Sequence, residues 1–219
     1  MALFYQQDIN EYTKLGIWKI EEPEDFFRQE VPLMRTIAHP HKRLQHLAGR
    51  FLLRQLYPNF PYKEIMIADT RKPFLPDERY HFSISHCGDY AAAIVSTEER
   101  VGIDIEQPTT RVFKILHKFL HSEELEQFQL VNTDELTDSK LSTLLWSAKE
   151  AMFKWWGWGD IDFSEVLRIK QFQFGNEGKF SAFFCKNDVQ IPLLINYKIF
   201  EGLCLAYTQS EPDAFKITD

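Results

Sequence analysis

Twice along this chain a periodic helix is followed by several strand-like segments, and this order constrains the fold more than any other feature of the sequence. In the first helix, expected at residues 42–56, Leu44, Leu47 and Phe51 recur at helical spacing. Strand-like segments then follow at residues 81–85, 90–96 and 100–106. After a second strong helix at residues 141–156, strands are expected at residues 168–174, 179–185, 193–199 and 203–208. The order hints at two similar halves, although they share too little sequence to be assigned as a repeat.

Two weaker elements complete the expected order. One or two strands are predicted within residues 3–20, and a helix is predicted at residues 113–128. Pro58 and Pro61 end the first strong helix, and Gly157 with Gly159 ends the second.

Composition is that of a globular protein. Of the 219 residues, 44% are hydrophobic, with nineteen Phe and five Trp, which is enough apolar area for a packed core. No stretch approaches the roughly 18–20 apolar residues of a membrane helix, and the first ten residues do not have the pattern of a signal peptide. The three cysteines are widely spaced and follow no metal-ligand pattern, as expected for reduced thiols in a cytoplasmic protein. A net charge of −7 counts against a nonspecific nucleic-acid binder, although basic residues cluster at 39–54 and 111–118.

Residues 101–106 form the most informative strand. Side chains alternate along a strand, so Gly102, Asp104 and Glu106 share one face, opposite three β-branched apolar residues. The two carboxylates lie about 7 Å apart, and like charges so close repel unless a cation or a proton lies between them. Mg²⁺ prefers one or two carboxylates together with substrate phosphates. The alternative is an exposed edge strand that happens to be acidic.

The second strong helix carries few charged groups. Glu150 and Lys154 are four residues apart and share a helix face. A neighbouring apolar stripe that would dock the helix against a sheet consists of Leu145, Ala148, Met152 and Trp155. The alternative for the charged residues is an ordinary surface ion pair, worth a few tenths of a kcal/mol.

Two further segments offer hydrogen-bond donors. Ser83 and Ser85 share one face of their strand, and His86 follows at a glycine turn, where a hydroxyl and an imidazole can bind a phosphate. Lys72 lies in an extended segment before a proline and could also reach a phosphate. The alternatives are a capped loop histidine and an ordinary surface lysine. No Gly-x-Ser-x-Gly elbow of a serine hydrolase is present in the sequence.

The first strong helix is basic. Lys42, His46, Arg50 and Arg54 follow an i, i+4 ladder, and Arg43 lies on the same helix. Stacked like charges are mildly unfavourable, so an anionic ligand would explain them. The alternative is neutralisation by acidic segments from elsewhere in the chain.

Taken together and in order, these residues resemble the larger, pseudo-dimeric type of 4'-phosphopantetheinyl transferase. The resemblance rests on Gly49-Arg50-Phe51-Leu52-Leu53-Arg54, Lys72-Pro73 with Phe82-Ser83-Ile84-Ser85-His86, Val101-Gly102-Ile103-Asp104-Ile105-Glu106, and Trp146-Ser147-Ala148-Lys149-Glu150-Ala151 with Lys154. These segments cover about residues 40 to 160, and the last two are the specific pair. The first forty and the last fifty residues match only in pattern.

The resemblance implies an α+β fold of two similar halves about a pseudo-twofold axis, residues 1–105 and 106–219, with coenzyme A in the cleft between them. It implies that Mg²⁺ is bound by Asp104, Glu106 and Glu150. It also implies that coenzyme A is bound by Lys42, Arg43, Arg50, Lys72, Ser85, His86, Lys149 and Lys154. Within this set, Lys149 and Lys154 would neutralise the diphosphate.

The implied reaction moves the phosphopantetheine arm of coenzyme A to a serine of an apo acyl or peptidyl carrier protein. Glu150 would act as general base, and Lys154 would stabilise the leaving phosphate. Carrier proteins are typically acidic, so we expect docking at Arg111, Lys114 and Lys118 with an exposed Phe113 or Phe119.

The resemblance leaves two other functions open. These are a non-catalytic coenzyme A-binding module and a metal-dependent phosphodiesterase. We expect no nucleic-acid or membrane partner, and a monomer would suffice for a fold with internal pseudo-symmetry. Which carrier protein or pathway is served is not predicted.

Overall fold

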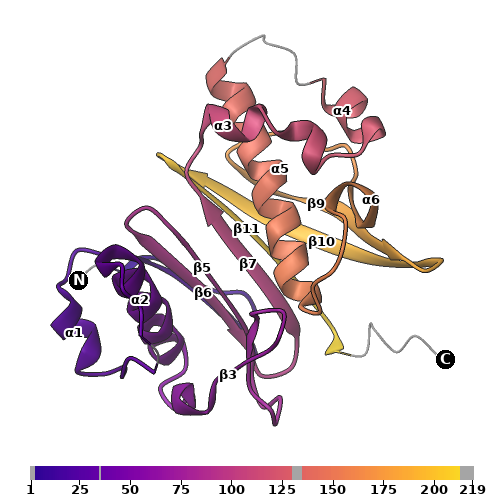
Figure 1. The fold of residues 1–219 in the computed structure, drawn as a ribbon. Coiled ribbons are helices and arrows are strands. Elements are labelled where there is room, and N and C mark those ends of the chain that lie inside the picture. The colour runs from indigo at the N-terminus through magenta and orange to yellow at the C-terminus, as the bar shows by residue number, and fades with distance from the viewer. Residues whose placement is uncertain (1–2, 35, 130–134, 213–219) are drawn as a thin grey trace. The chain divides into compact units, whose positions relative to one another are not determined.

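The computed structural model describes residues 3–34, 36–129 and 135–212, with side chains from residue 138 onward in the last range (Figure 1). The chain divides into two compact units, Met1–Val101 and Gly102–Asp219. The predicted boundary, between Ile105 and Glu106, lies later in the same strand, β7 (Arg100–Glu106). The fold is α+β, as predicted.

The first unit is built on a four-stranded antiparallel sheet in the order β1-β2-β6-β5. Its strands are β1 (Leu3–Asp8), β2 (Thr13–Lys19), β5 (His81–Cys87) and β6 (Tyr90–Ser96). The smaller elements are α1 (Glu24–Arg28), a 3-10 turn at Tyr62–Glu64, and a ribbon of β3 (Met66–Ile67) and β4 (Pro73–Phe74). The strands predicted within residues 3–20 and at 81–85 and 90–96 are confirmed.

The long helix of this unit is α2 (Pro40–Leu56). It begins two residues before the predicted start, because Pro40 is favoured in a first helical turn and His39 accepts a hydrogen bond from the Lys42 backbone N–H. Its apolar face packs into a core that includes Leu47, and the ring of Phe51 lies 5.1 Å from that of Trp18. The helical spacing of the sequence thus predicted the buried face.

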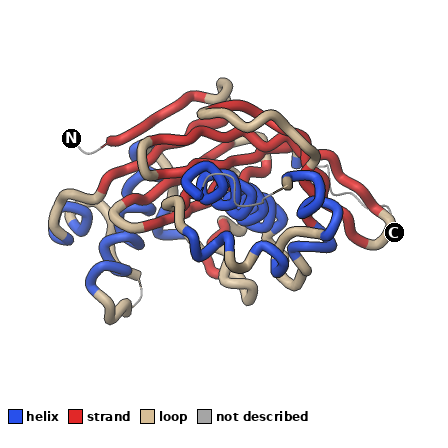
Figure 2. The backbone as a smooth tube through the Cα atoms, turned by 90° about the horizontal axis from the view of Figure 1, so that it is seen from above, coloured by secondary structure: helices blue, strands red, loops and turns tan. Residues whose placement is uncertain are grey.

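The second unit is built on a five-stranded sheet in the order β7-β11-β10-β9-β8. Besides β7, its strands are β8 (Leu167–Ile169), β9 (Glu177–Lys186), β10 (Val189–Phe200) and β11 (Leu203–Ser210). The helix α5 (Glu135–Trp156) runs along one face of this sheet, as Figure 2 also shows. The predicted apolar stripe is fully buried at Leu145, Ala148, Met152 and Trp155.

The prediction of one helix at 113–128 is wrong. This part of the chain forms α3 (Thr110–Phe113), a 3-10 turn η2 (Leu116–Lys118) and α4 (Ser122–Phe128). The break has a local cause, since His121 caps α4 while Glu124 bonds back to the His121 N–H in a capping box.

The strand predicted at 168–174 is shorter than expected. The β8 ladder ends at Ile169, and after it Phe172 stacks on Phe180 with ring centroids 4.0 Å apart. A short helix, α6 (Phe163–Val166), precedes β8. No described helix is long and apolar enough to cross a membrane.

Candidate active site

The polar face of β7 packs against the last turns of α5. A Cβ atom built on Gly102 would lie 2.0 Å from the carbonyl oxygen of Ala151 and 2.9 Å from the Cβ of Trp155. Only a residue without a side chain lets strand and helix approach this closely. The close approach brings Asp104, 3% exposed, to the helix, so the alternative of an exposed acidic edge strand is wrong.

Lys154 on α5 forms an ion pair with Asp104 on β7. Its Nζ lies 2.6 Å from Oδ1 of Asp104, in an ion pair whose carboxylate is 4% exposed and whose lysine is 25% exposed. An ordinary surface pair would leave both groups in water. A charge-assisted hydrogen bond this deep fixes the ammonium at the β7 face of the helix.

Glu150 lies in an environment that disfavours its negative charge. Burial raises the pKa of Glu150 to about 7, and the negative charges of Asp104 and Glu106 add to the shift, whereas Lys154 opposes it. Carboxylates from β7 and α5 therefore act on one another electrostatically. A divalent cation would relieve this repulsion, and an all-oxygen donor set suits a hard ion.

The described residues do not already form a closed metal cage. Among them, no group of three His, Cys, Asp or Glu side chains has the geometry to hold a metal ion. Mg²⁺ usually keeps several water ligands and needs only one or two carboxylates beside phosphate oxygens. The carboxylates on β7 and α5 fit that mode of binding.

Lys149 does not face this site. Its side chain is fully buried and its Nζ donates to Glu124, to the carbonyl of Phe119 and to the carbonyl of Phe163. An ammonium has three N–H donors, and all three are used within the protein. The expectation that Lys149 neutralises the coenzyme A diphosphate is therefore corrected.

The remaining predicted ligand residues lie in the first unit. Lys72 is partly buried, and burial, with a smaller contribution from Arg100, lowers its pKa to about 7. A lysine in such a place gains from an anionic ligand, which restores the charged form. Ser85 is buried within β5, whereas His86, next along the strand, is exposed.

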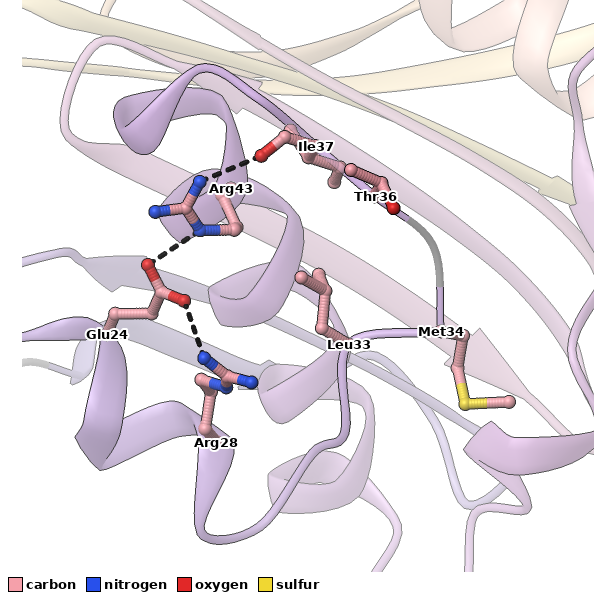
Figure 3. Close-up of a pocket in the computed structure, with 7 residues that line it drawn as sticks. All are labelled: Glu24, Arg28, Leu33, Met34, Thr36, Ile37 and Arg43. Carbon is pink, nitrogen blue, oxygen red and sulfur yellow. Dashed lines mark hydrogen bonds and ion pairs between the residues drawn. The ribbon is translucent and has the colours of Figure 1, made fainter.

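An acidic segment neutralises part of the basic helix. Glu24 lies between Arg28 and Arg43, as Figure 3 shows. These three residues help to line a pocket of about 440 Å³. Arg43 Nε lies 2.7 Å from Glu24, and Arg43 also donates to the carbonyl of Ile37. The alternative of internal neutralisation thus holds for Arg43.

Other cations of α2 differ from one another. Arg54 pairs with Glu30 at 2.9 Å, and Arg50 lies 3.0 Å from the Nδ1 of a buried His46. Lys42 is exposed. Sequence reasoning foresaw acidic partners in general terms, but it did not name Glu24 or Glu30.

Sequence reasoning also missed Glu124. Two signals could have found it: the capping-box spacing from His121, and the rule that a buried lysine needs a paired acid.

Comparisons with known proteins match both units. Residues 100–208 match the family model of the 4'-phosphopantetheinyl transferase superfamily, and residues 30–96 match the 4'-phosphopantetheinyl transferase N-terminal domain. Similar proteins include enterobactin synthase component D of Escherichia coli (strain K12), 33% identical over 143 residues, which are 61% of this chain and 66% of the relative. The corresponding protein of Salmonella austin is 31% identical over 118 residues, 52% of this chain and 47% of the relative.

A mammalian protein is similar as well. The L-aminoadipate-semialdehyde dehydrogenase-phosphopantetheinyl transferase of Mus musculus is 32% identical over 126 residues, 49% of this chain and 40% of the relative. The matched part of this chain thus spans between 40% and 66% of the lengths of these three relatives.

Proposed function

Since this chain belongs to the 4'-phosphopantetheinyl transferase superfamily, we propose that it transfers the 4'-phosphopantetheine arm of coenzyme A to a serine of an apo acyl or peptidyl carrier protein. The other product is adenosine 3',5'-bisphosphate. The observation that carries the proposal is the set of charged groups between β7 and α5, where Asp104, Glu150 and Lys154 are held by one close strand–helix contact.

Asp104, Glu106 and Glu150 would hold a magnesium ion. Bound there with the diphosphate, Mg²⁺ supplies Lewis-acid polarisation and neutralises charge on phosphate oxygens. The charge repulsion around Glu150 supports this assignment.

Glu150 is the proposed general base. In the reaction, the serine oxygen forms a bond to the phosphorus that carries the phosphopantetheine arm, and the bond from that phosphorus to the adenosine-bearing phosphate breaks. The hydroxyl proton passes to Glu150. In the protein without metal, burial raises the pKa of Glu150 to about 7; a magnesium ion beside it would favour the ionised carboxylate, which is the form that accepts a proton.

Lys154 is proposed to stabilise the leaving phosphate. Negative charge grows on the oxygen that departs, and an ammonium already oriented by Asp104 needs little reorganisation to meet it. Lys72, Ser85 and His86 are proposed to bind phosphates at the nucleotide end. Lys42 and Arg50 are proposed ligands of coenzyme A as well. Arg43, which the resemblance also assigns to coenzyme A, is proposed to contribute little to binding, because its guanidinium would first have to leave Glu24.

A docking segment for the carrier is proposed on α3 and η2, defined by Arg111, Lys114 and Lys118. All three are exposed, and none has an ion pair with a described residue. Phe113 is half-buried at the edge of this segment, but Phe119 is 1% exposed, so it cannot be the aromatic contact. Cations that pair with no described acid, on an otherwise acidic protein, suit an acidic partner.

One assay tests the proposal. The protein is incubated with coenzyme A, Mg²⁺ and an apo carrier protein, and the carrier is weighed by mass spectrometry. A mass gain equal to phosphopantetheine supports transfer; hydrolysed coenzyme A with an unchanged carrier indicates a phosphodiesterase, and no chemistry indicates a binding module. Glu150→Gln should abolish transfer while leaving most coenzyme A binding, and full activity in that variant would exclude Glu150 as the base.

A cytoplasmic location is proposed as well, and the three free thiols support it.

The docking segment has a test of its own. Reversing the charges of Arg111 and Lys114 should raise KM for the carrier and leave the affinity for coenzyme A unchanged. An equal loss of coenzyme A binding would contradict the docking assignment.

A further inference from the structure

Lys149 is buried in the second unit with all its donors satisfied. Its Nζ lies 2.6 Å from Oε2 of Glu124, 2.7 Å from the carbonyl oxygen of Phe119 and 3.1 Å from that of Phe163. Three acceptors around one buried nitrogen, one of them a carboxylate, are the partners that an ammonium requires. The Lys149 side chain therefore links three separate segments of the unit by hydrogen bonds.

Glu124 is equally well held. It is 2% exposed, and besides Lys149 it accepts hydrogen bonds from the backbone N–H of His121 at 2.8 Å and of Ile169 at 2.7 Å. The pair thus joins α5 to the start of α4 and to β8. Buried charges cost free energy to desolvate, and these are compensated because each is paired and also bonded to backbone groups.

The pair joins two parts of the proposed reaction. On α5, Lys149 directly precedes Glu150, the proposed base. At the other end of the bond network, the Phe119 carbonyl directly follows Lys118, the last residue of the docking segment. A shift of Lys149 would therefore move the base and the docking segment relative to each other.

We infer that Lys149 is a positioning residue, which acts through Glu124 and the Phe119 carbonyl to fix the docking segment relative to Glu150. This inference rests on the proposed transferase function. Lys149 touches neither coenzyme A nor the carrier in this role. An apolar side chain at this position could fill the same space, but it could not bind the Glu124 carboxylate and the two carbonyls at once, as the Lys149 ammonium does.

The test compares Lys149→Met with Glu124→Gln, each assayed at a temperature at which circular dichroism shows the variant folded. Glutamine keeps the shape of Glu124 and an acceptor oxygen for the Ile169 N–H. The inference can therefore still be tested with Glu124→Gln if the Lys149→Met protein does not fold. Lys198→Met is the matched control, because Lys198 forms a surface pair with Glu177 on the sheet.

The expected result is a split between chemistry and binding. A misplacement of about 1 Å costs roughly 100-fold in rate, so kcat should fall by about that factor in Lys149→Met and by about tenfold in Glu124→Gln. The Kd for coenzyme A, measured by calorimetry, should stay within about twofold in both variants, and the control should keep wild-type kcat.

Two results would overturn the inference. A Kd for coenzyme A raised about tenfold or more would mean that Lys149 binds the coenzyme directly. A kcat within about threefold of wild type in either folded variant would mean that the pair only stabilises the fold. Failure of the proposed function itself looks different, because the wild-type protein would then produce no modified carrier.

Discussion

Replacing Gly102 with alanine should disturb the close contact between β7 and α5. The added Cβ would lie 2.0 Å from the Ala151 carbonyl oxygen and 2.7 Å from the Trp155 backbone nitrogen. Cβ atoms essentially never approach other atoms within 3.0 Å, so strand and helix must separate by at least about 1 Å. These neighbours are backbone atoms, which cannot turn away as a flexible side chain can.

The expected cost is both thermodynamic and catalytic. Overpacking of this kind costs about 1–3 kcal/mol, which for a chain of this size lowers Tm by about 2–4 °C per kcal/mol. Because Lys154 on the helix bonds Asp104 on the strand at 2.6 Å, the separation also pulls this pair apart. We expect kcat to fall by roughly 100-fold, as misplacement by about 1 Å does elsewhere.

Two glycines of the same unit serve as controls. A Cβ atom built on Gly175 would make only ordinary van der Waals contacts, the nearest at 3.9 Å, so Gly175→Ala should change neither Tm nor kcat appreciably. Gly202 has a φ of 76° and no neighbour within 4 Å, so Gly202→Ala should lower Tm through backbone strain and leave kcat unchanged. Thermal denaturation and the carrier mass assay measure both quantities in all three variants.

Two outcomes would refute the reasoning about Gly102. If Gly102→Ala keeps the wild-type Tm and kcat, the contact between β7 and α5 is not tight enough to matter. If Gly102→Ala and Gly202→Ala lower Tm equally and also lower kcat equally, the loss of kcat reflects unfolding and not the separation of Lys154 from Asp104.

Three further predictions concern charge. Because the pKa of Glu150 is raised to about 7 in the folded protein, the contribution of Glu150 to the free energy of unfolding is complete below about pH 4.5 and is lost as pH rises through 7. Glu150→Gln should therefore be about 3 kcal/mol more stable than wild type near pH 8 and equally stable near pH 4.5. Urea denaturation of the magnesium-free proteins measures this difference. The pKa of Lys72 is lowered to about 7, so Lys72→Met should stabilise the ligand-free protein near pH 6, and this gain in stability should shrink as pH approaches about 10.5. The same variant should bind coenzyme A more weakly in calorimetry. Unchanged binding would remove Lys72 from the proposed ligands. Arg43→Met should lower the free energy of unfolding, measured with denaturant, by about 1 kcal/mol. The Kd for coenzyme A should stay within about twofold, because Glu24 already binds the guanidinium. A large rise in Kd would show that the ligand displaces Glu24.

Periodic elements were predictable from the sequence. The helices α2 and α5 bury apolar residues that repeat at the helix period, and the sequences of β5 and β7 alternate between apolar and polar residues. The strand β6 was predicted from a short run of small apolar residues, and it is buried on both faces from Ala91 to Ser96. The alternation of β7 and the helical spacing of α5 also predicted which faces carry Asp104 and Glu150, whereas their assignment as site residues came from the resemblance and stays a prediction.

Long-range polar partners were not predictable. Lys149 and Glu124 are 25 residues apart, and neither sequence position shows that the other will be buried beside it. The break at His121 depends on side-chain caps, which end a helix without disturbing the apolar spacing that predicted one. The pairing of Arg43 with Glu24 likewise depends on how α1 folds back on α2.

The proposed docking segment, whose cations have no ion pair with a described residue, has a consequence for how two acidic proteins would meet. With a net charge of −7, this chain repels an acidic carrier at long range, whereas Arg111, Lys114 and Lys118 attract it only nearby. At physiological ionic strength the Debye length is about 8 Å, so the repulsion between whole molecules is screened while attraction at contact survives. If the carrier docks as proposed, the salt of the cell favours encounter, and these three cations select the orientation in which the encounter succeeds.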